Sequence, residues 1–89
     1  MYEDAYRVPF RLERRPPEYR LVNEGDEPVH GVAVTVHGAG MLAANSPAKL
    51  QPGEALEVTI SGERLERASI LVVRWFRPDG VEYLWRASL

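Results

Sequence analysis

The segment Ser69–Ala87, with the sequence SILVVRWFRPDGVEYLWRA, decides the fold of this 89-residue chain. Two runs rich in β-branched and aromatic residues flank Arg77-Pro78-Asp79-Gly80, a pattern that predicts a β-hairpin. Proline fits the second position of a type I turn, aspartate the third, and glycine the left-handed position that follows. The sequence therefore predicts two antiparallel strands joined by a three-residue loop.

The loop type also predicts the register of this hairpin. A type I turn followed by a bulge pairs Trp75 with Tyr83 and Val73 with Trp85. One face is assigned to the core, because aromatic side chains bury the largest areas; it carries Leu71, Val73, Trp75, Val81, Tyr83 and Trp85. The opposite face mixes apolar and charged side chains, namely Val72, Arg74, Phe76, Glu82, Leu84 and Arg86.

Alternation of apolar and polar residues continues upstream of the hairpin and predicts further strands. In a first strand the apolar Tyr6, Val8, Phe10 and Leu12 share one face, and Pro9 marks a sheet edge because it cannot donate to a ladder. Other strands are expected at 19–23, 29–37 and 56–61, with a short strand at 48–50 inside a crossover loop at 38–54. Residues 62–68 are expected to form a brief helical turn anchored by Leu65.

These elements predict one all-β domain spanning residues 1–89, an antiparallel β-sandwich of about seven strands. A domain of this length buries only ~60–65% of the surface of its unfolded chain, so it has a single modest core. Its centre is expected at Val34, Val58, Val73 and Trp85.

Composition narrows the classes of function and compartment. The chain has no cysteine, which excludes disulfides and thiolate metal sites. A net charge of -2 argues against nucleic-acid binding, which needs a surplus of basic residues on one face. No segment approaches the ~20 apolar residues of a membrane span, and Met1-Tyr2-Glu3-Asp4 lacks the features of a signal peptide. We therefore expect no membrane contact and a cytoplasmic location.

Two turn motifs resemble those of bacterial immunoglobulin-like interaction and adhesion modules. Asn23-Glu24-Gly25-Asp26-Glu27-Pro28 is similar to their Asn-x-Gly turn before a Gly-Val strand, here Gly31-Val32. Leu50-Gln51-Pro52-Gly53-Glu54 is similar to their Leu-x-Pro-Gly-Glu approach to a later strand. The resemblance implies an immunoglobulin-like sandwich in which strands 29–37, 69–77 and 81–87 share one sheet. It also implies that strands 19–23 and 56–61 belong to the other sheet, while the first strand closes an edge.

Motifs that carry chemistry are weak in this chain. Gly38-Ala39-Gly40 follows a valine-rich strand as in a dinucleotide fingerprint, but Ser46-Pro47 leaves no room for the required helix. His37 with the same glycines echoes an esterase oxyanion loop, yet no Gly-x-Ser-x-Gly elbow supplies a nucleophile. We therefore expect neither an enzyme nor a cofactor.

Histidines and carboxylates give no convincing site either. His30 and His37 are expected at opposite ends and on opposite faces of one strand, so they cannot share a metal. The carboxylate pairs Glu54/Glu57 and Glu63/Glu66 are interpreted as solvated charges, because no spacing fixes either pair across a cleft. No metal site is expected.

The outer face of the hairpin sheet is the predicted interaction surface, since aromatic and arginine side chains are enriched at protein contacts. Its residues are Val72, Arg74, Phe76, Leu84 and Arg86, beside a shallow floor of Gly31, Ala33 and Thr35. We expect it to mediate a homodimer or bind a protein partner, unless Tyr2 and Tyr6 fold back over it. The alternative function is a sandwich that binds a small ligand or carbohydrate through Trp75 and Trp85, if these are exposed.

Overall fold

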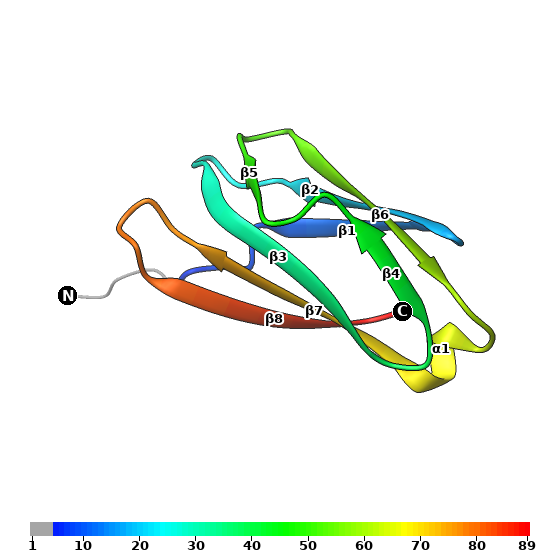
Figure 1. The fold of residues 1–89 in the computed structure, drawn as a ribbon. Helices are drawn as coiled ribbons and strands as arrows, with labels where there is room; N and C mark the ends of the chain where they lie inside the picture. The colour runs from blue at the N-terminus through cyan, green and yellow to red at the C-terminus, as the bar shows by residue number, and fades with distance from the viewer. Residues whose placement is uncertain (1–4) are drawn as a thin grey trace.

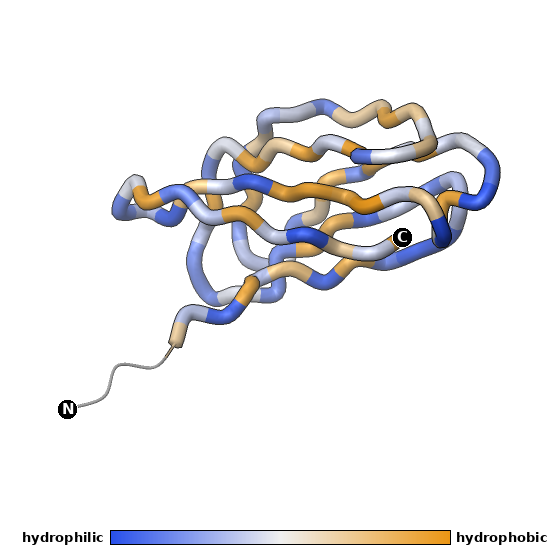
Figure 2. Tube along the Cα trace, turned by 90° about the horizontal axis from the view of Figure 1, so that it is seen from below, coloured by the Kyte–Doolittle hydropathy of each residue, from blue (hydrophilic) through white to orange (hydrophobic). Residues whose placement is uncertain are grey.

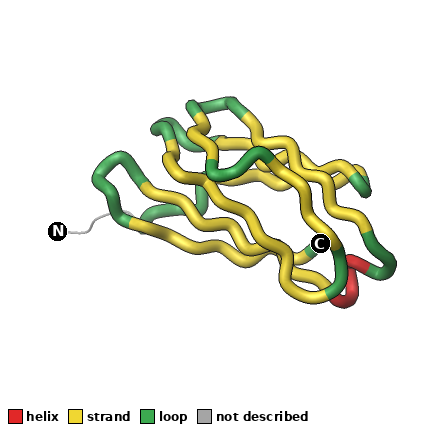
Figure 3. The backbone as a smooth tube through the Cα atoms, in the orientation of Figure 1, coloured by secondary structure: helices red, strands yellow, loops and turns green. Residues whose placement is uncertain are grey.

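The protein folds into two layers of β-strands with a single turn of helix at one end (Figures 1 and 3). This computed structural model describes residues 5–89, except for the side chain of Glu66. In chain order the elements are β1 (Phe10–Arg15), β2 (Glu18–Asn23), β3 (Val29–Gly38), β4 (Met41–Ala44), β5 (Ala48–Leu50), β6 (Ala55–Ser61), α1 (Leu65–Ala68), β7 (Ser69–Phe76) and β8 (Glu82–Ser88). The first sheet has the strand order β1-β2-β6-β4 and the second sheet has the order β5-β3-β7-β8, both antiparallel. The expected all-β sandwich is confirmed.

The division of strands between the sheets also follows the prediction. β3, β7 and β8 share the second sheet, β2 and β6 share the first, and β1 lies at an edge. The short strand β5 and the helical turn α1 are present, with Leu65 buried. The expected loop at 38–54 also contains β4, which the sequence did not predict. β4 forms because its backbone pairs with β6, a long-range contact that a run of small and apolar residues does not reveal locally.

The β7–β8 hairpin has the predicted register. Trp75 lies opposite Tyr83 and Val73 opposite Trp85. The Gly80 N–H donates to the Arg77 carbonyl at 2.8 Å, the Arg77 N–H donates to the Val81 carbonyl at 3.0 Å, and Gly80 has a φ of 86°. These are the features of a type I turn followed by a left-handed glycine.

The core lies between the two sheets. Hydrophobic and hydrophilic segments alternate along the strands, and several of the turns are hydrophilic (Figure 2). Val34, Val58 and Val73 are buried at its centre as expected. Trp85 is only half-buried because β8 is an edge strand, and Trp75 on the neighbouring β7 is the large buried aromatic residue, 1% exposed. The expectation that Val81 joins the core was wrong: it lies between the turn and β8 and is 49% exposed.

The first strand begins later than predicted. β1 starts at Phe10, and the alternation expected upstream is inverted, because Pro9 is buried and Val8 is 42% exposed. The Pro9 carbonyl accepts a hydrogen bond from the Glu24 N–H at 2.7 Å, which turns the chain before pairing with β2 begins.

A bulge in β3 changes which face its first residues occupy. The register with β7 shifts between His30 and Ala33, and Gly31 within the bulge has a φ of 55°. An extra residue in one strand inverts the alternation beyond it. His30 therefore lies opposite Phe76 and His37 opposite Ile70, which puts both histidines on the same face of the sheet, at opposite ends. The expectation of opposite faces was wrong.

The two turn motifs of the sequence meet at one end of the sandwich. Asn23 is fully buried and its side chain makes three hydrogen bonds. Its Oδ1 accepts from the Gly25 N–H at 2.9 Å, and its Nδ2 donates to the carbonyls of Glu27 and Leu50, both at 3.0 Å. Its backbone N–H donates to the Glu54 carbonyl at 2.9 Å. Asn23 thus joins the turn after β2 to the turn before β6. Across residues 5–89, no helix is long and apolar enough to cross a membrane.

Candidate functional site

The outer face of the second sheet carries a patch of exposed apolar side chains. Ile70 is 44% exposed, Phe76 38% and Leu84 53%. All three lie on the solvent side of β7 or β8, because side chains on one face alternate along each strand. The arginines Arg74 and Arg86 lie among them and are exposed. We call these five residues the outer patch.

Four of the five residues predicted for this surface belong to the outer patch, and Val72 does not. Val72 is 8% exposed, because β7 is an interior strand and the neighbouring strands β3 and β8 flank it on both sides. It forms the floor of a hollow of about 370 Å³ whose walls include His37, Ile70, Leu84 and Arg86. Ile70 and His37 were missed, although the same alternation that selected Val72 puts Ile70 on this face.

Each arginine of the outer patch has a different electrostatic environment. The Arg74 guanidinium is 2.9 Å from the Glu82 carboxylate, which neutralises it within the chain. Arg86 forms no ion pair with any of the described side chains, those of residues 5–89 other than Glu66. At the other end of the patch the Phe76 ring lies over Gly31, where an added Cβ would approach the ring to 3.0 Å. The bulge in β3 thus creates the space into which Phe76 packs.

The N-terminal segment does not cover the outer patch with Tyr6. The Tyr6 ring lies 4.6 Å from that of Tyr83, and the Tyr6 hydroxyl accepts a hydrogen bond from Trp75 Nε1 at 3.0 Å. Tyr83 and Trp75 lie opposite each other on the core face of the sheet, so Tyr6 closes the end of the core. Tyr2, the other residue of that expectation, lies outside the described residues.

The outer face of the first sheet is chemically different, because charged pairs dominate it. Glu13 is 2.9 Å from Arg11 and 3.1 Å from Arg20, and Arg20 is 2.8 Å from Glu57. Arg11 also reaches Glu24 at 2.6 Å. The hydrogen bond from Arg11 lowers the pKa of the Glu13 carboxyl. Exposed ion pairs therefore cover strands β1, β2 and β6 of this face, and Met41, 78% exposed, lies at its edge on β4. The second sheet exposes Ile70, Phe76 and Leu84 on its two strands β7 and β8.

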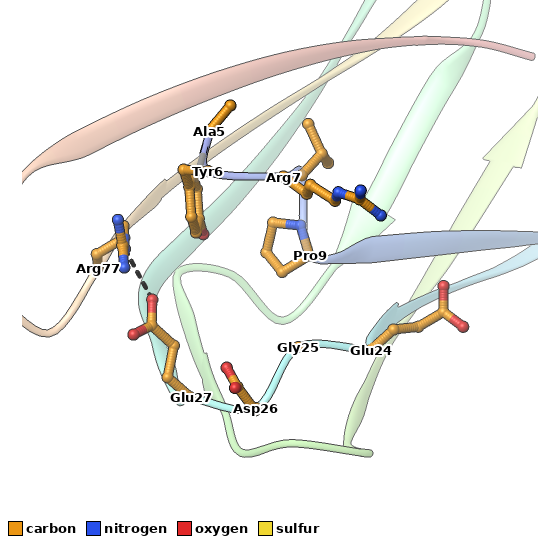
Figure 4. A pocket seen from close by; sticks show the side chains of 10 residues that line it. Ala5, Tyr6, Arg7, Pro9, Glu24, Gly25, Asp26, Glu27 and Arg77 are labelled. Carbon is orange, nitrogen blue, oxygen red and sulfur yellow. Dashed lines mark hydrogen bonds and ion pairs between the residues drawn. The ribbon is translucent and has the colours of Figure 1, made fainter. Parts of the chain in front are cut away.

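A second hollow, of about 790 Å³, lies beside the N-terminal segment (Figure 4). Arg77 crosses it: its Nε donates to the Glu27 carboxylate at 2.8 Å, and its guanidinium lies 4.0 Å from the centre of the Tyr6 ring. The hydrogen bond to Glu27 raises the pKa of Arg77. Burial raises the pKa of the Tyr6 hydroxyl, although the hydrogen bond from Trp75 opposes this. The arrangement ties residues 5–9 to the sandwich through contacts that occupy the polar groups of Arg77 and Tyr6.

The tryptophans do not form the exposed stacking surface that sugar binding requires. Trp75 is 1% exposed and packs edge-on against Phe10, with ring centres 4.9 Å apart. Trp85 is half-buried, and its ring lies 6.4 Å from that of Phe10. Gly38-Ala39-Gly40 leads into β4, a strand, so the fingerprint interpretation stays rejected. Among the side chains that the structure describes, no group of three or more His, Asp or Glu residues could hold a metal ion.

Comparison with protein-family models, with curated proteins and with solved structures finds no significant match to this chain.

Proposed function

We propose that this chain is a non-catalytic protein-interaction module that uses the outer patch as its contact surface. The observation that carries the proposal is the exposure of three large apolar side chains, Ile70, Phe76 and Leu84, on one face of one sheet. Apolar side chains scattered singly need no explanation, but a group on one face marks a site of contact. Ile70 and Leu84 line one hollow together with Val72, and Phe76 lies on the same face at the other end of β7.

The contrast between the two sheets supports this assignment. Both sheets have one face in the core and one face in solvent, so their outer faces should be equally polar if neither had a partner. The first sheet carries the ion-pair network of Arg11, Glu13, Arg20 and Glu57, and Met41 at the start of its edge strand β4 is a large exposed apolar side chain outside this network. The second sheet instead exposes Ile70, Phe76 and Leu84, with arginines interspersed, a composition enriched at protein interfaces.

The proposal includes an immunoglobulin-like architecture of the bacterial interaction type. The two-sheet sandwich and the two turn motifs support this architecture. The side chain of the buried Asn23 hydrogen-bonds to residues of both motifs and so fixes the two loops to each other at one end of the sandwich. These motifs shape turns, so they support the architecture and not the identity of a partner. The support for a protein contact comes from the outer patch alone.

The double variant Phe76→Ser, Leu84→Ser tests the contact surface. Because both side chains are exposed, we expect a folded protein with a circular dichroism spectrum like that of the wild type and weaker association in sedimentation velocity. Met41→Ser, an exposed apolar position on β4 of the other sheet, is a matched control that should change neither property. If the double variant unfolds, or associates as strongly as the wild type, the outer patch is not the contact surface.

A further inference from the structure

The edge strand β8 presents backbone groups that no other strand uses. β8 is the last strand of the order β5-β3-β7-β8, and Figure 1 shows it at the margin of its sheet. The Arg77 N–H donates to the Val81 carbonyl, so the backbone of Val81 faces the preceding strand. In an antiparallel pair every second residue faces its partner in this way, so the backbone groups of Tyr83 and Trp85 also point toward β7. The N–H and C=O groups of Glu82, Leu84 and Arg86 therefore point to the free edge. Within residues 5–89 no hydrogen bond reaches them.

β8 has few of the features that usually protect a sheet edge. The strand is seven residues long and contains neither proline, glycine nor lysine. Its protecting features are two exposed charges of opposite sign, Glu82 and Arg86, and a hydrogen bond from Arg14 to the Ser88 carbonyl at its end. The other edge strand of the same sheet, β5, has three residues, and β4 in the first sheet has four. β1 has six residues, and its charged residues Arg11 and Glu13 form ion pairs within the chain. In β8 Glu82 does so, whereas Arg86 forms none with the described side chains. β8 is thus the longest edge strand among the described residues.

The sequence of β8 is complementary to itself when it runs antiparallel to a second copy. Centred on Leu84, the pairing puts Glu82 opposite the Arg86 position and Tyr83 opposite the Trp85 position of the other copy. Both charged pairs are of opposite sign, and both inner pairs are aromatic, combinations that stabilise antiparallel sheets. Among the described side chains, those of residues 5–89 without Glu66, Arg86 has no ion-pair partner. Pairing with the other copy would put Arg86 opposite a Glu82 carboxylate that also contacts Arg74 of its own chain at 2.9 Å, so the two arginines would share this carboxylate.

Charge selects this register over its neighbours. Shifting the centre to Glu82 would put two glutamates opposite each other, and shifting it to Arg86 would put two arginines opposite each other. Centres at Tyr83 or Trp85 would put Leu84 opposite a charged residue. Only the centre at Leu84 matches every charge with its opposite and also pairs outward-pointing backbone groups with one another.

The side chains on both faces of β8 fit such a contact. On the outer face Leu84 is 53% exposed and would meet the equivalent leucine across the two-fold axis. On the inner face Tyr83 and Trp85 are only half-buried, since no further strand covers them. A partner strand would shield both faces at once and would join the two outer patches into one continuous surface.

We infer that two copies of this chain associate through antiparallel pairing of their β8 strands, centred on Leu84, to form a continuous eight-stranded sheet. The inference rests on the proposed function, since it names the partner of the outer patch as a second copy and adds the edge through which the copies join. A single strand pair buries little surface, so the dimer is expected at the weak end of specific interfaces.

Charge reversal tests the pairing directly. In Glu82→Arg, arginine faces Arg86 of the other copy at both symmetric positions, and in Arg86→Glu, glutamate faces Glu82. Each variant should raise the dissociation constant of the dimer about tenfold or more, measured by sedimentation equilibrium over about a hundredfold concentration range. An equimolar mixture of the two variants should form a heterodimer, because every charged pair is again of opposite sign. The double variant carrying both changes should dimerise like the wild type.

Two variants with the same changes in net charge serve as controls. Glu63→Arg and Arg67→Glu change exposed residues around α1, and they should dimerise like the wild type. A wild-type chain that stays monomeric at every concentration, or a mixture of the two reversed variants that stays monomeric, would overturn the inference.

The variant Phe76→Ser separates this inference from the proposed function, because Phe76 lies on β7 and is absent from the strand pairing. Weaker association of Phe76→Ser together with a monomeric mixture would keep the outer patch as a contact and reject the β8 pairing. The opposite result would keep the β8 pairing and reject the outer patch as a contact. In that result the mixture of Glu82→Arg and Arg86→Glu forms a heterodimer, and neither Phe76→Ser alone nor the double variant with Leu84→Ser changes the association.

Discussion

The buried side chain of Asn23 is expected to be the most costly polar group to remove from this protein. Replacing it with alanine deletes three hydrogen bonds, those with the Gly25 N–H and with the carbonyls of Glu27 and Leu50. At ~1 kcal/mol for each bond, the free energy of unfolding should fall by about 3 kcal/mol. A domain of this size has a total stability of only ~4–13 kcal/mol, so the loss is a large fraction of it.

Replacing Asn23 with aspartate keeps the shape of the side chain and removes only its Nδ2 donor. A carboxylate oxygen would then face the carbonyl oxygens of Glu27 and Leu50, which Nδ2 now contacts at 3.0 Å. At pH 7 Asn23→Asp should cost at least as much as Asn23→Ala, since it also buries a charge. The deficit should shrink on acidification, because a protonated carboxyl regains one donor.

The stability of both variants can be measured by urea denaturation, followed by the tryptophan fluorescence of the buried Trp75 and the half-buried Trp85. The melting temperature of Asn23→Ala should fall by about 12–24 °C, since each kcal/mol corresponds to about 4–8 °C in a domain of this size. Asn45→Ala, at an exposed position, is the matched control and should stay within ~0.5 kcal/mol of the wild type. A loss below ~1 kcal/mol for Asn23→Ala, or wild-type stability of Asn23→Asp at pH 7, would refute the role given to this network.

Three further predictions concern the hairpin, the N-terminal segment and the charged face. Gly80→Ala should destabilise the protein by ~1 kcal/mol or more in thermal denaturation, because the φ of 86° is unfavourable for alanine. No atom lies near the added Cβ, so the backbone conformation is the sole source of this cost, and an unchanged melting temperature would contradict it. Tyr6→Phe leaves the buried Trp75 N–H without its acceptor and should cost ~1–3 kcal/mol in urea denaturation, and a neutral result would show that water replaces the bond. The pKa of Glu13 is lowered in the folded protein, chiefly by the hydrogen bond from Arg11. The carboxylate therefore stabilises the fold fully above the pKa of an unfolded glutamate, ~4.3, and this stabilisation is lost as the pH falls through the lower pKa of the folded state. The difference in melting temperature between wild type and Glu13→Gln should therefore vanish in acid, and a difference that is independent of pH would contradict this assignment.

Local sequence determined the hairpin, most strands and the turns. The register of β7 with β8 followed from Pro78, Asp79 and Gly80, because a three-residue loop with a left-handed glycine permits one pairing. Alternation located β2, β3 and β6, since side chains on successive strand residues point to opposite faces. These properties depend on neighbours within a few positions of the chain, and the amino-acid sequence contains them fully.

The outer patch was predicted only in part, because exposure depends on strands that are distant in sequence. Phe76, Leu84 and the two arginines were placed correctly on the solvent face, but Val72 on the same face is buried between neighbouring strands. Whether a residue lies on an interior or an edge strand decides this, and alternation within one strand carries no such information. The same reason leaves Trp85 half-buried at the edge, while Trp75 is enclosed.

Tertiary structure alone decided β4, the start of β1 and the faces of the histidines. β4 exists through its pairing with β6, and β1 begins where pairing with β2 begins. The bulge in β3 puts His30 and His37 on one face, and the three-residue spacing between Val29 and Val32 was its sole local sign. Backbone pairing and an inserted residue are properties of two strands together, whereas the sequence pattern of one strand describes that strand alone.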